Sequence, residues 1–131
     1  MHYEFTADYL TGIEFIDNEH QKLFDIANET FDLLSNNFVN DKYDRIISLI
    51  SELREYTITH FADEEKYMES IQYLHRFSHK LEHIKFVEKL NSINLEEIDI
   101  NQKDGIVDLL QFLVEWLQNH IKKKDCRIQK Q

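Results

Sequence analysis

The chain of 131 residues contains no proline and only two glycines, Gly12 and Gly105. Proline and glycine are the strongest interrupters of helices, so their scarcity favours long, unbroken helices. The only cysteine, Cys126, excludes an internal disulfide framework and an iron–sulfur cluster held by four cysteines. Because a lone thiol is typical of a reducing compartment, we predict a cytoplasmic protein.

Positive charge and long apolar runs are scarce as well. The chain has 15 Lys and Arg against 25 Asp and Glu, a net charge of −10. This charge predicts no nucleic-acid and no membrane partner, because nucleic acids and anionic membranes repel an acidic protein. No apolar run approaches the roughly 20 residues that cross a bilayer, and the start MHYEFTADYL does not resemble a signal peptide. We expect one globular domain over residues 1–131.

Apolar residues recur at helical spacing in four segments. They are Leu23, Ala27, Phe31 and Leu34; Ile46, Ile50, Leu53, Thr57 and Phe61; Leu74, Leu81 and Leu90; and Ile106, Leu109, Leu113, Trp116 and Leu117. With Asp17, Asp41, Ser70 and Asn101 as N-caps, we predict helices over about 17–36, 41–69, 71–91 and 102–124, after an arm at 1–16. Short connections favour antiparallel neighbours, so the predicted fold is all-α: an up-down-up-down antiparallel four-helix bundle with an N-terminal arm.

Seven polar side chains occupy positions on these helices that helix packing does not require: His20, His60, Glu64, His79, His83, His120 and Asp125. In such a bundle all seven lie at one end, where the first and third helices start and the second and fourth end. The i, i+4 pairs His60/Glu64 and His79/His83 each share a helix face. The two pairs are mirrored about the turn between them, which places Glu64 opposite His79. Asp125 follows His120 by five residues and needs a helix end or a distortion to join them.

This combination of side chains predicts a metal site, because imidazoles on a core-facing stripe must be satisfied by a partner. Seven ligands are too many for one tetrahedral zinc ion. Two octahedral ions fit better, since five histidines, two bridging carboxylates and one bridging oxygen fill all but one of their positions. The residues alone leave the metal open, because imidazole suits iron, zinc, copper and nickel.

The spacing H…HxxxE…HxxxH…HxxxxD resembles the signature of the hemerythrin family, and of its bacterial members in particular. The resemblance covers about residues 5–125 and is carried by GIEFIDNEHQKLF (12–24), HFADEEKYM (60–68), HKLEH (79–83) and WLQNHIKKKD (116–125). It implies a centre of two non-haem iron ions with an oxo or hydroxo bridge. By the same resemblance, His79, His83 and His120 bind one iron, and His20 and His60 bind the other. Glu64 and Asp125 bridge the two.

The resemblance also implies a function, the reversible binding of dioxygen for storage, delivery or sensing, and not catalysis. The matching oxygen pocket would consist of the apolar residues Leu23, Phe61, Trp116, Leu117 and Ile121, which would equally serve as ordinary core. Two alternatives stay open: a di-iron enzyme that reduces peroxide or nitric oxide, and an iron-responsive or structural metal module. The enzyme is disfavoured, because ferritin-like di-iron sites use more carboxylates and E-x-x-H pairs, which this chain lacks.

Three further polar residues lie near the predicted ligands in the sequence. His75 precedes His79 by one helical turn, and we predict that it is solvated and outside the cluster. Asp63 and Glu65 flank Glu64, and we predict that they belong to a solvated face of the second helix.

Overall fold

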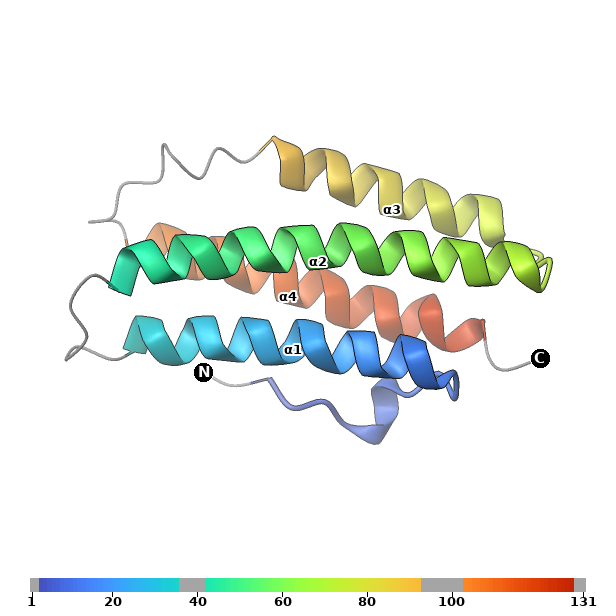
Figure 1. Cartoon of the computed structure of the whole chain (residues 1–131), viewed down its shortest axis with the longest axis horizontal. Coiled ribbons are helices and arrows are strands. Elements are labelled where there is room, and N and C mark those ends of the chain that lie inside the picture. Colours follow the sequence, from blue (N-terminus) through green and yellow to red (C-terminus); the bar gives the residue numbers. More distant parts are fainter. Residues whose placement is uncertain (1–2, 36–41, 93–102, 129–131) are drawn as a thin grey trace.

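The structure is a computed structural model that describes residues 3–35, 42–92 and 103–128. Its four long helices are α1 (Glu14–Ser35), α2 (Lys42–Ser70), α3 (Arg76–Asn91) and α4 (Lys103–Lys123). Two short 3-10 helices, η1 (Ala7–Tyr9) and η3 (Asp125–Arg127), lie at the two ends of the described chain. Successive long helices run in opposite directions (Figure 1), so the predicted all-α, up-down-up-down four-helix bundle is confirmed.

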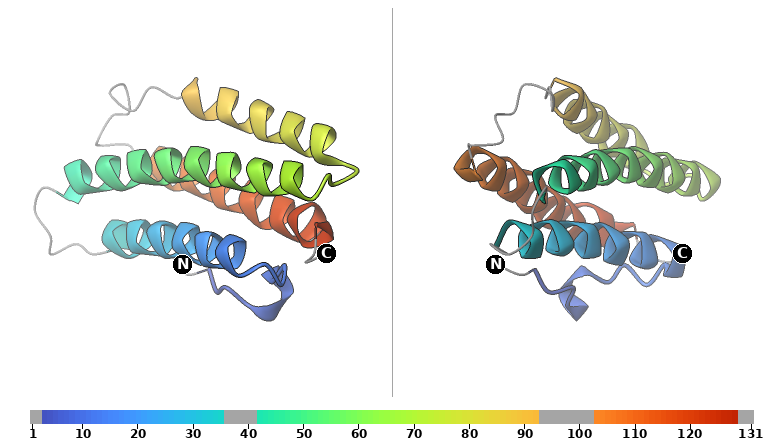
Figure 2. Two further views of the ribbon diagram at one scale, coloured as in Figure 1. Left: turned by 45° about the vertical axis from the view of Figure 1, so that its right-hand side comes forward. Right: turned by 60° about the vertical axis from the view of Figure 1, so that its left-hand side comes forward.

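The four helices are arranged so that one end of the bundle gathers distant parts of the sequence. The start of α1, the end of α2, the start of α3 and the end of α4 all lie at the right-hand end in Figure 1. Helix α1 packs against α2 and α4, while α3 lies beside α2 on the side of the bundle away from α1 (Figure 2). Within the described segments, no helix combines the length and the apolar character that a membrane crossing requires.

The predicted apolar stripes of the first, second and fourth helices meet in one core. Its wholly buried members include Leu49, Leu53 and Leu110. The third stripe was predicted wrongly, because only Leu90 is buried, whereas Leu74 is 80% and Leu81 51% exposed. Helix α3 turns His79 and His83 inward, so residues on the opposite side of this helix point away from the bundle.

The turn between α2 and α3 differs from the prediction. Helix α3 begins at Arg76 and not at residue 71, because Gln72 adopts a left-handed backbone conformation with φ of 52°. The Tyr73 N–H donates to the Met68 carbonyl at 2.9 Å and the Gln72 N–H to Glu69 at 3.1 Å, which is the Schellman pattern of a helix end. Ser70 therefore ends α2 and does not cap α3.

Helix α1 also begins earlier than predicted, at Glu14, so that Asp17 lies inside it. The Asp17 carboxylate accepts hydrogen bonds from the Thr11 N–H and hydroxyl, both at 2.8 Å, and from the Gly12 N–H at 3.2 Å. These bonds hold the preceding loop, in which Gly12 has a φ of 84°. The predicted caps Asp41 and Asn101 lie outside the described residues.

The N-terminal arm lies over α1 and α4. The backbone N–H and carbonyl of Tyr3 each pair with the Asn28 side-chain amide at 2.7 Å. Further along, Tyr9 is buried in a small cluster with Phe24 and Ile121. The arm is thus tied to the bundle at two points.

Candidate metal centre

The seven predicted ligands meet at one end of the bundle, and every one of them is 5% exposed or less. Helix α1 supplies His20, α2 supplies His60 and Glu64, α3 supplies His79 and His83, α4 supplies His120, and η3 supplies Asp125. The structure therefore brings all seven together, with no member left outside.

Asp125 reaches the cluster because α4 ends just before it. The helix stops at Lys123, and the chain then tightens into the 3-10 turn in which the Ile128 N–H donates to the Asp125 carbonyl at 3.0 Å. This change of backbone places the Asp125 carboxylate beside His120, with Oδ1 3.1 Å from Nε2. A spacing of five residues, which is off-face on a straight helix, is accommodated by the helix end.

Three histidines point their Nε2 atoms at one spot. The Nε2 atom of His120 lies 3.0 Å from that of His83 and 3.1 Å from that of His79. Two oxygens complete this group, since Glu64 Oε1 and Asp125 Oδ1 each lie 2.8 Å from His79 Nε2. Such a convergence of nitrogens and carboxylate oxygens is the donor arrangement of a cation site.

A second, smaller group lies beside the first and shares its carboxylates. Asp125 Oδ2 is 3.0 Å from His20 Nε2, and Glu64 Oε2 is 3.3 Å from His60 Nε2 and 3.7 Å from His20 Nε2. Each carboxylate thus directs one oxygen to the three-histidine group and the other to the two-histidine group. Two cation positions that share Glu64 and Asp125 account for both groups.

Several of these buried polar atoms lie close to one another but have no hydrogen-bond partner in the described part of the chain. His20 Nε2, His60 Nε2, Glu64 Oε2 and both Asp125 oxygens make no hydrogen bond within the described part of the chain. A buried polar atom left in this way costs about 1–3 kcal/mol, and native proteins contain few of them. Nitrogen and oxygen donors that face one another across a buried space fit bound metal ions, which would satisfy all of them at once.

The charges of the cluster favour a bound cation. Burial lowers the pKa of His60, but the hydrogen bond to Glu19 and the adjacent Glu64 carboxylate outweigh it and raise this pKa to about 10. Burial likewise lowers the pKa of His79, but the Asp125 and Glu64 carboxylates raise it to about 9. Although burial alone would raise the pKa of Glu64, four surrounding histidines hold it well below the usual range. The carboxylates therefore stay anionic and favour positive charge beside them.

Two carboxylates behind the ligands were not predicted. His60 Nδ1 donates to Glu19 Oε1 at 2.8 Å, and His83 Nδ1 donates to Glu65 Oε2 at 2.9 Å. The prediction of a solvated face was wrong for Glu65, whose side chain is only 24% exposed. A carboxylate on Nδ1 fixes the imidazole so that Nε2 presents its lone pair to the cluster. Adjacency to His20 and to Glu64 was the only sequence signal for Glu19 and Glu65.

Aromatic rings hold two of the histidines from the core side. Phe61 stacks on His83 with a centroid distance of 3.8 Å and an angle of 2°, and Trp116 stacks on His120 at 4.6 Å and 10°. Among the predicted oxygen-pocket residues, Leu23, Phe61 and Leu117 are buried in the main core and Trp116 is half-buried at its edge. Ile121 lies in the separate cluster beneath the arm.

His75 lies at the start of α3, exposed and away from the cluster. Its ring packs edge-on against Tyr73 at 5.7 Å, and its backbone carbonyl accepts the His79 N–H at 3.0 Å. The structure thus places it as the sequence predicted, outside the group of seven.

A bundle whose core carries histidines and shared carboxylates from all four helices is a cation-binding helical-bundle protein. Comparison with known proteins names the family: residues 11–129 match the model of the hemerythrin HHE cation binding domain, and the chain belongs to the hemerythrin family. It is 49% identical over 118 residues to the bacteriohemerythrin of Clostridium acetobutylicum, covering 90% of this chain and 92% of that protein. It is 32% identical over 125 residues to the hemerythrin alpha subunit of Lingula reevii, covering 95% and 91%.

The solved structures agree with the sequence relatives. A crystal structure of wild-type hemerythrin superposes with a TM-score of 0.78 at 29% identity, covering 95% of this chain and 92% of that one. The resemblance to bacterial hemerythrins is therefore confirmed. The predicted function, oxygen binding, is confirmed at the level of this family.

Proposed function

We propose that this chain binds dioxygen reversibly at a centre of two iron ions held by the seven buried ligands. The observation that carries the proposal is the division of the Glu64 and Asp125 oxygens between two groups of histidines. Shared carboxylates of this kind suit a pair of ions about 3.5–4 Å apart. Two iron ions held in these positions would each supply one electron to the dioxygen that binds.

The residues would divide the work between the two positions. His79, His83 and His120 would hold one iron, and His20 and His60 the other, while Glu64 and Asp125 would bridge them. The two-histidine position has fewer protein ligands, so it is the position at which a small molecule would enter. Glu19 and Glu65 would orient one histidine of each group through their Nδ1 hydrogen bonds.

The apolar side chains predicted to form the oxygen pocket favour reversible binding. Leu23, Phe61, Leu117 and Ile121 are each 3% exposed or less, and none offers a proton. A site that excludes water and contains no general acid protects bound dioxygen from protonation and loss as peroxide. We propose that these four residues and Trp116 form the oxygen pocket.

The experiment that tests the function is an oxygenation cycle on the iron-loaded protein. The protein is reduced without oxygen, dioxygen is added, and the visible charge-transfer band is followed while iron is counted by elemental analysis. Two irons per chain and a band that disappears on deoxygenation support the proposal. Steady turnover of peroxide or nitric oxide without a reversible band would instead identify the di-iron enzyme.

The oxygen pocket has its own test. Leu23→Ala should admit water and speed the loss of the oxygenated form, whereas Leu53→Ala, a matched change of a buried leucine in the same core, should lower stability without that effect. Equal rates in the two variants would remove the pocket from the proposal. A cytoplasmic location, and the choice between storage, delivery and sensing, stay predictions from the sequence.

A further inference from the structure

Helix α3 has a buried face and, opposite it, an exposed apolar face. Its inner face carries the buried residues His79, His83, Phe86 and Leu90. Opposite them, four large apolar side chains form what we name the outer stripe, with exposures of 80%, 72%, 51% and 43% for Leu74, Phe77, Leu81 and Ile84. Steps of four and three residues place Phe77, Leu81 and Ile84 on one face of the helix, and Leu74 lies in the turn just before it.

The outer stripe is unusual for this protein. Of the seven large apolar side chains that are exposed in the described part of the chain, four belong to it. Singly exposed apolar residues are normal, but a contiguous row at a/d spacing is the pattern with which a helix packs against another helix. Helix α1 lies on the far side of the bundle (Figure 2), and in the described part of the chain the row is exposed.

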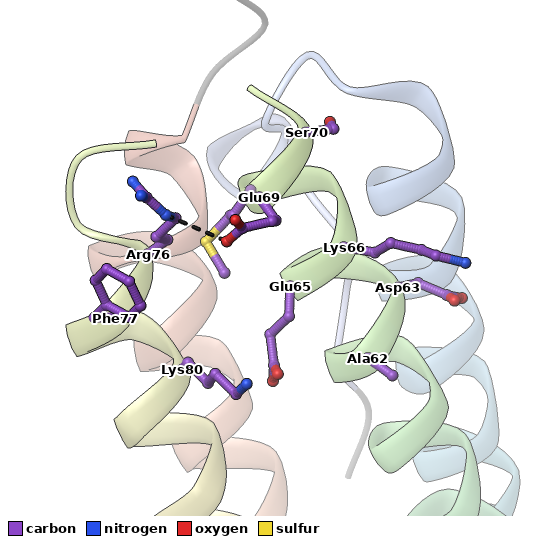
Figure 3. A pocket seen from close by; sticks show the side chains of 10 residues that line it. Ala62, Asp63, Glu65, Lys66, Glu69, Ser70, Arg76, Phe77 and Lys80 are labelled. Atoms are coloured by element: carbon purple, nitrogen blue, oxygen red, sulfur yellow. Dashed lines mark ion pairs between the residues drawn. The ribbon is translucent and has the colours of Figure 1, made fainter. Parts of the chain in front are cut away.

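A groove borders the outer stripe along its α2 side. The groove has a volume of about 690 Å³, and its lining includes Met68, Phe77 and Lys80. Figure 3 shows Phe77 and Lys80 on the α3 wall, with Glu65 opposite, while the Arg76–Glu69 ion pair at 3.3 Å crosses the upper part. The apolar row and the groove together offer a ridge and a furrow to an approaching helix.

The charge of helix α3 itself is opposite in sign to that of the chain, whereas the lining of the groove is balanced, with three acidic and three basic residues. Helix α3 carries four basic and two acidic residues, in a chain with a net charge of −10. Helical geometry places Lys80 on one side of the stripe and Lys85 on the other, where a coiled coil carries the charges that select its partner. These two lysines therefore favour an apolar partner helix that carries acidic residues beside its apolar row.

We propose that the outer stripe is a docking surface for an amphipathic helix of another protein, one whose apolar row is flanked by Asp and Glu. A second copy of α3 fits less well, because a parallel pair would set Lys80 against Lys85 of the other copy. An anionic membrane also fits less well, because the chain as a whole would be repelled. The docking surface lies on the helix that supplies His79 and His83, but the proposal does not depend on what the metal centre binds.

The test uses two synthetic helical peptides with the same apolar a/d row, one with Glu and one with Lys at the flanking positions. Fluorescence anisotropy on the purified, metal-containing chain should show at least about tenfold tighter binding of the Glu peptide, with the affinity falling as salt rises. Leu81→Ser should weaken that binding about tenfold. Leu10→Ser, a change at another exposed leucine on the N-terminal arm, should not.

A charge reversal makes the test specific. The double variant with Lys80→Glu and Lys85→Glu should prefer the Lys peptide, with circular dichroism confirming that every variant keeps its helices. Equal affinity for both peptides, or no effect of Leu81→Ser, would overturn the proposal. Self-association that Leu81→Ser abolishes would assign the surface to a second copy, and binding to vesicles that contain phosphatidylglycerol would assign it to a membrane; either result overturns it too.

Discussion

The sharpest test of the proposed metal centre is at Glu65, behind the predicted ligand His83. Its carboxylate accepts the His83 Nδ1 hydrogen at 2.9 Å, so it would act on a bound metal only through the histidine. Loss of such a partner lowers metal affinity by about 10–100-fold. Because the Glu65 side chain is 24% exposed, water takes over part of its role, and we expect the lower end. Glu65→Ala should therefore weaken iron binding about tenfold, or about 1.4 kcal/mol.

The conservative variant separates charge from geometry. Glu65→Gln keeps an acceptor oxygen for the His83 N–H but removes the negative charge, and a charge-assisted hydrogen bond is roughly twice as strong as a neutral one. We therefore expect an effect between those of the native residue and the alanine variant. The matched control is Glu69→Gln, one turn further along α2, where the carboxylate is 72% exposed and pairs with Arg76 at the surface.

The assay is competition for iron with a chelator of known affinity, followed by elemental analysis of the protein fraction. The order of iron retention should be native, Glu65→Gln and then Glu65→Ala, with Glu69→Gln equal to native. The reasoning is refuted if Glu65→Ala retains iron as well as Glu69→Gln does while both variants stay folded by circular dichroism.

Three further predictions concern stability and metal loading. Gln72→Gly should raise the free energy of unfolding by about 0.5–1 kcal/mol. A left-handed conformation costs a non-glycine residue about 1–2 kcal/mol, and the greater flexibility of glycine in the unfolded chain offsets part of this gain. Urea denaturation measures the change, and a loss of stability would contradict the prediction. Leu110→Ala should lower the unfolding free energy by about 2–5 kcal/mol, since Leu110 is wholly buried, and a change below 1 kcal/mol on the same assay would show that the core closes around the gap. Iron loading should release protons and should weaken as the pH falls through about 10 and about 9, the pKa values of His60 and His79. Below its pKa each histidine holds a proton that it must lose to bind a metal. Loading that is independent of pH would count against their role as ligands.

Much of the bundle follows from periodicity and spacing. Stripes such as Leu23, Ala27 and Phe31 have one buried face, and three of the four helices satisfy that pattern. The group of seven was predictable because paired ligands at i, i+4 on antiparallel helices meet only in one register. Glu64 and His79 do lie opposite each other, at 2.8 Å.

The features that escaped prediction depend on how helices are placed in space. Because Glu65 directly follows Glu64 in a helix, its side chain is expected to point away from the site. It contacts His83 because α3 packs beside this part of α2. Leu81 belongs to an apolar series and was expected to be buried, but the buried face of α3 carries His79 and His83 instead. Gln72 gave no turn signal, because a left-handed residue is usually glycine.

If two ions bind as proposed, the shared oxygens of Glu64 and Asp125 make the two positions thermodynamically dependent on each other. An ion in the three-histidine position would fix both carboxylates, and their remaining oxygens would then already face His20 and His60. The second ion meets a preorganised site and loses less conformational freedom in the ligands, so uptake should be positively cooperative. Chains with both ions and chains with none should dominate a partly loaded sample, and singly loaded chains should be scarce.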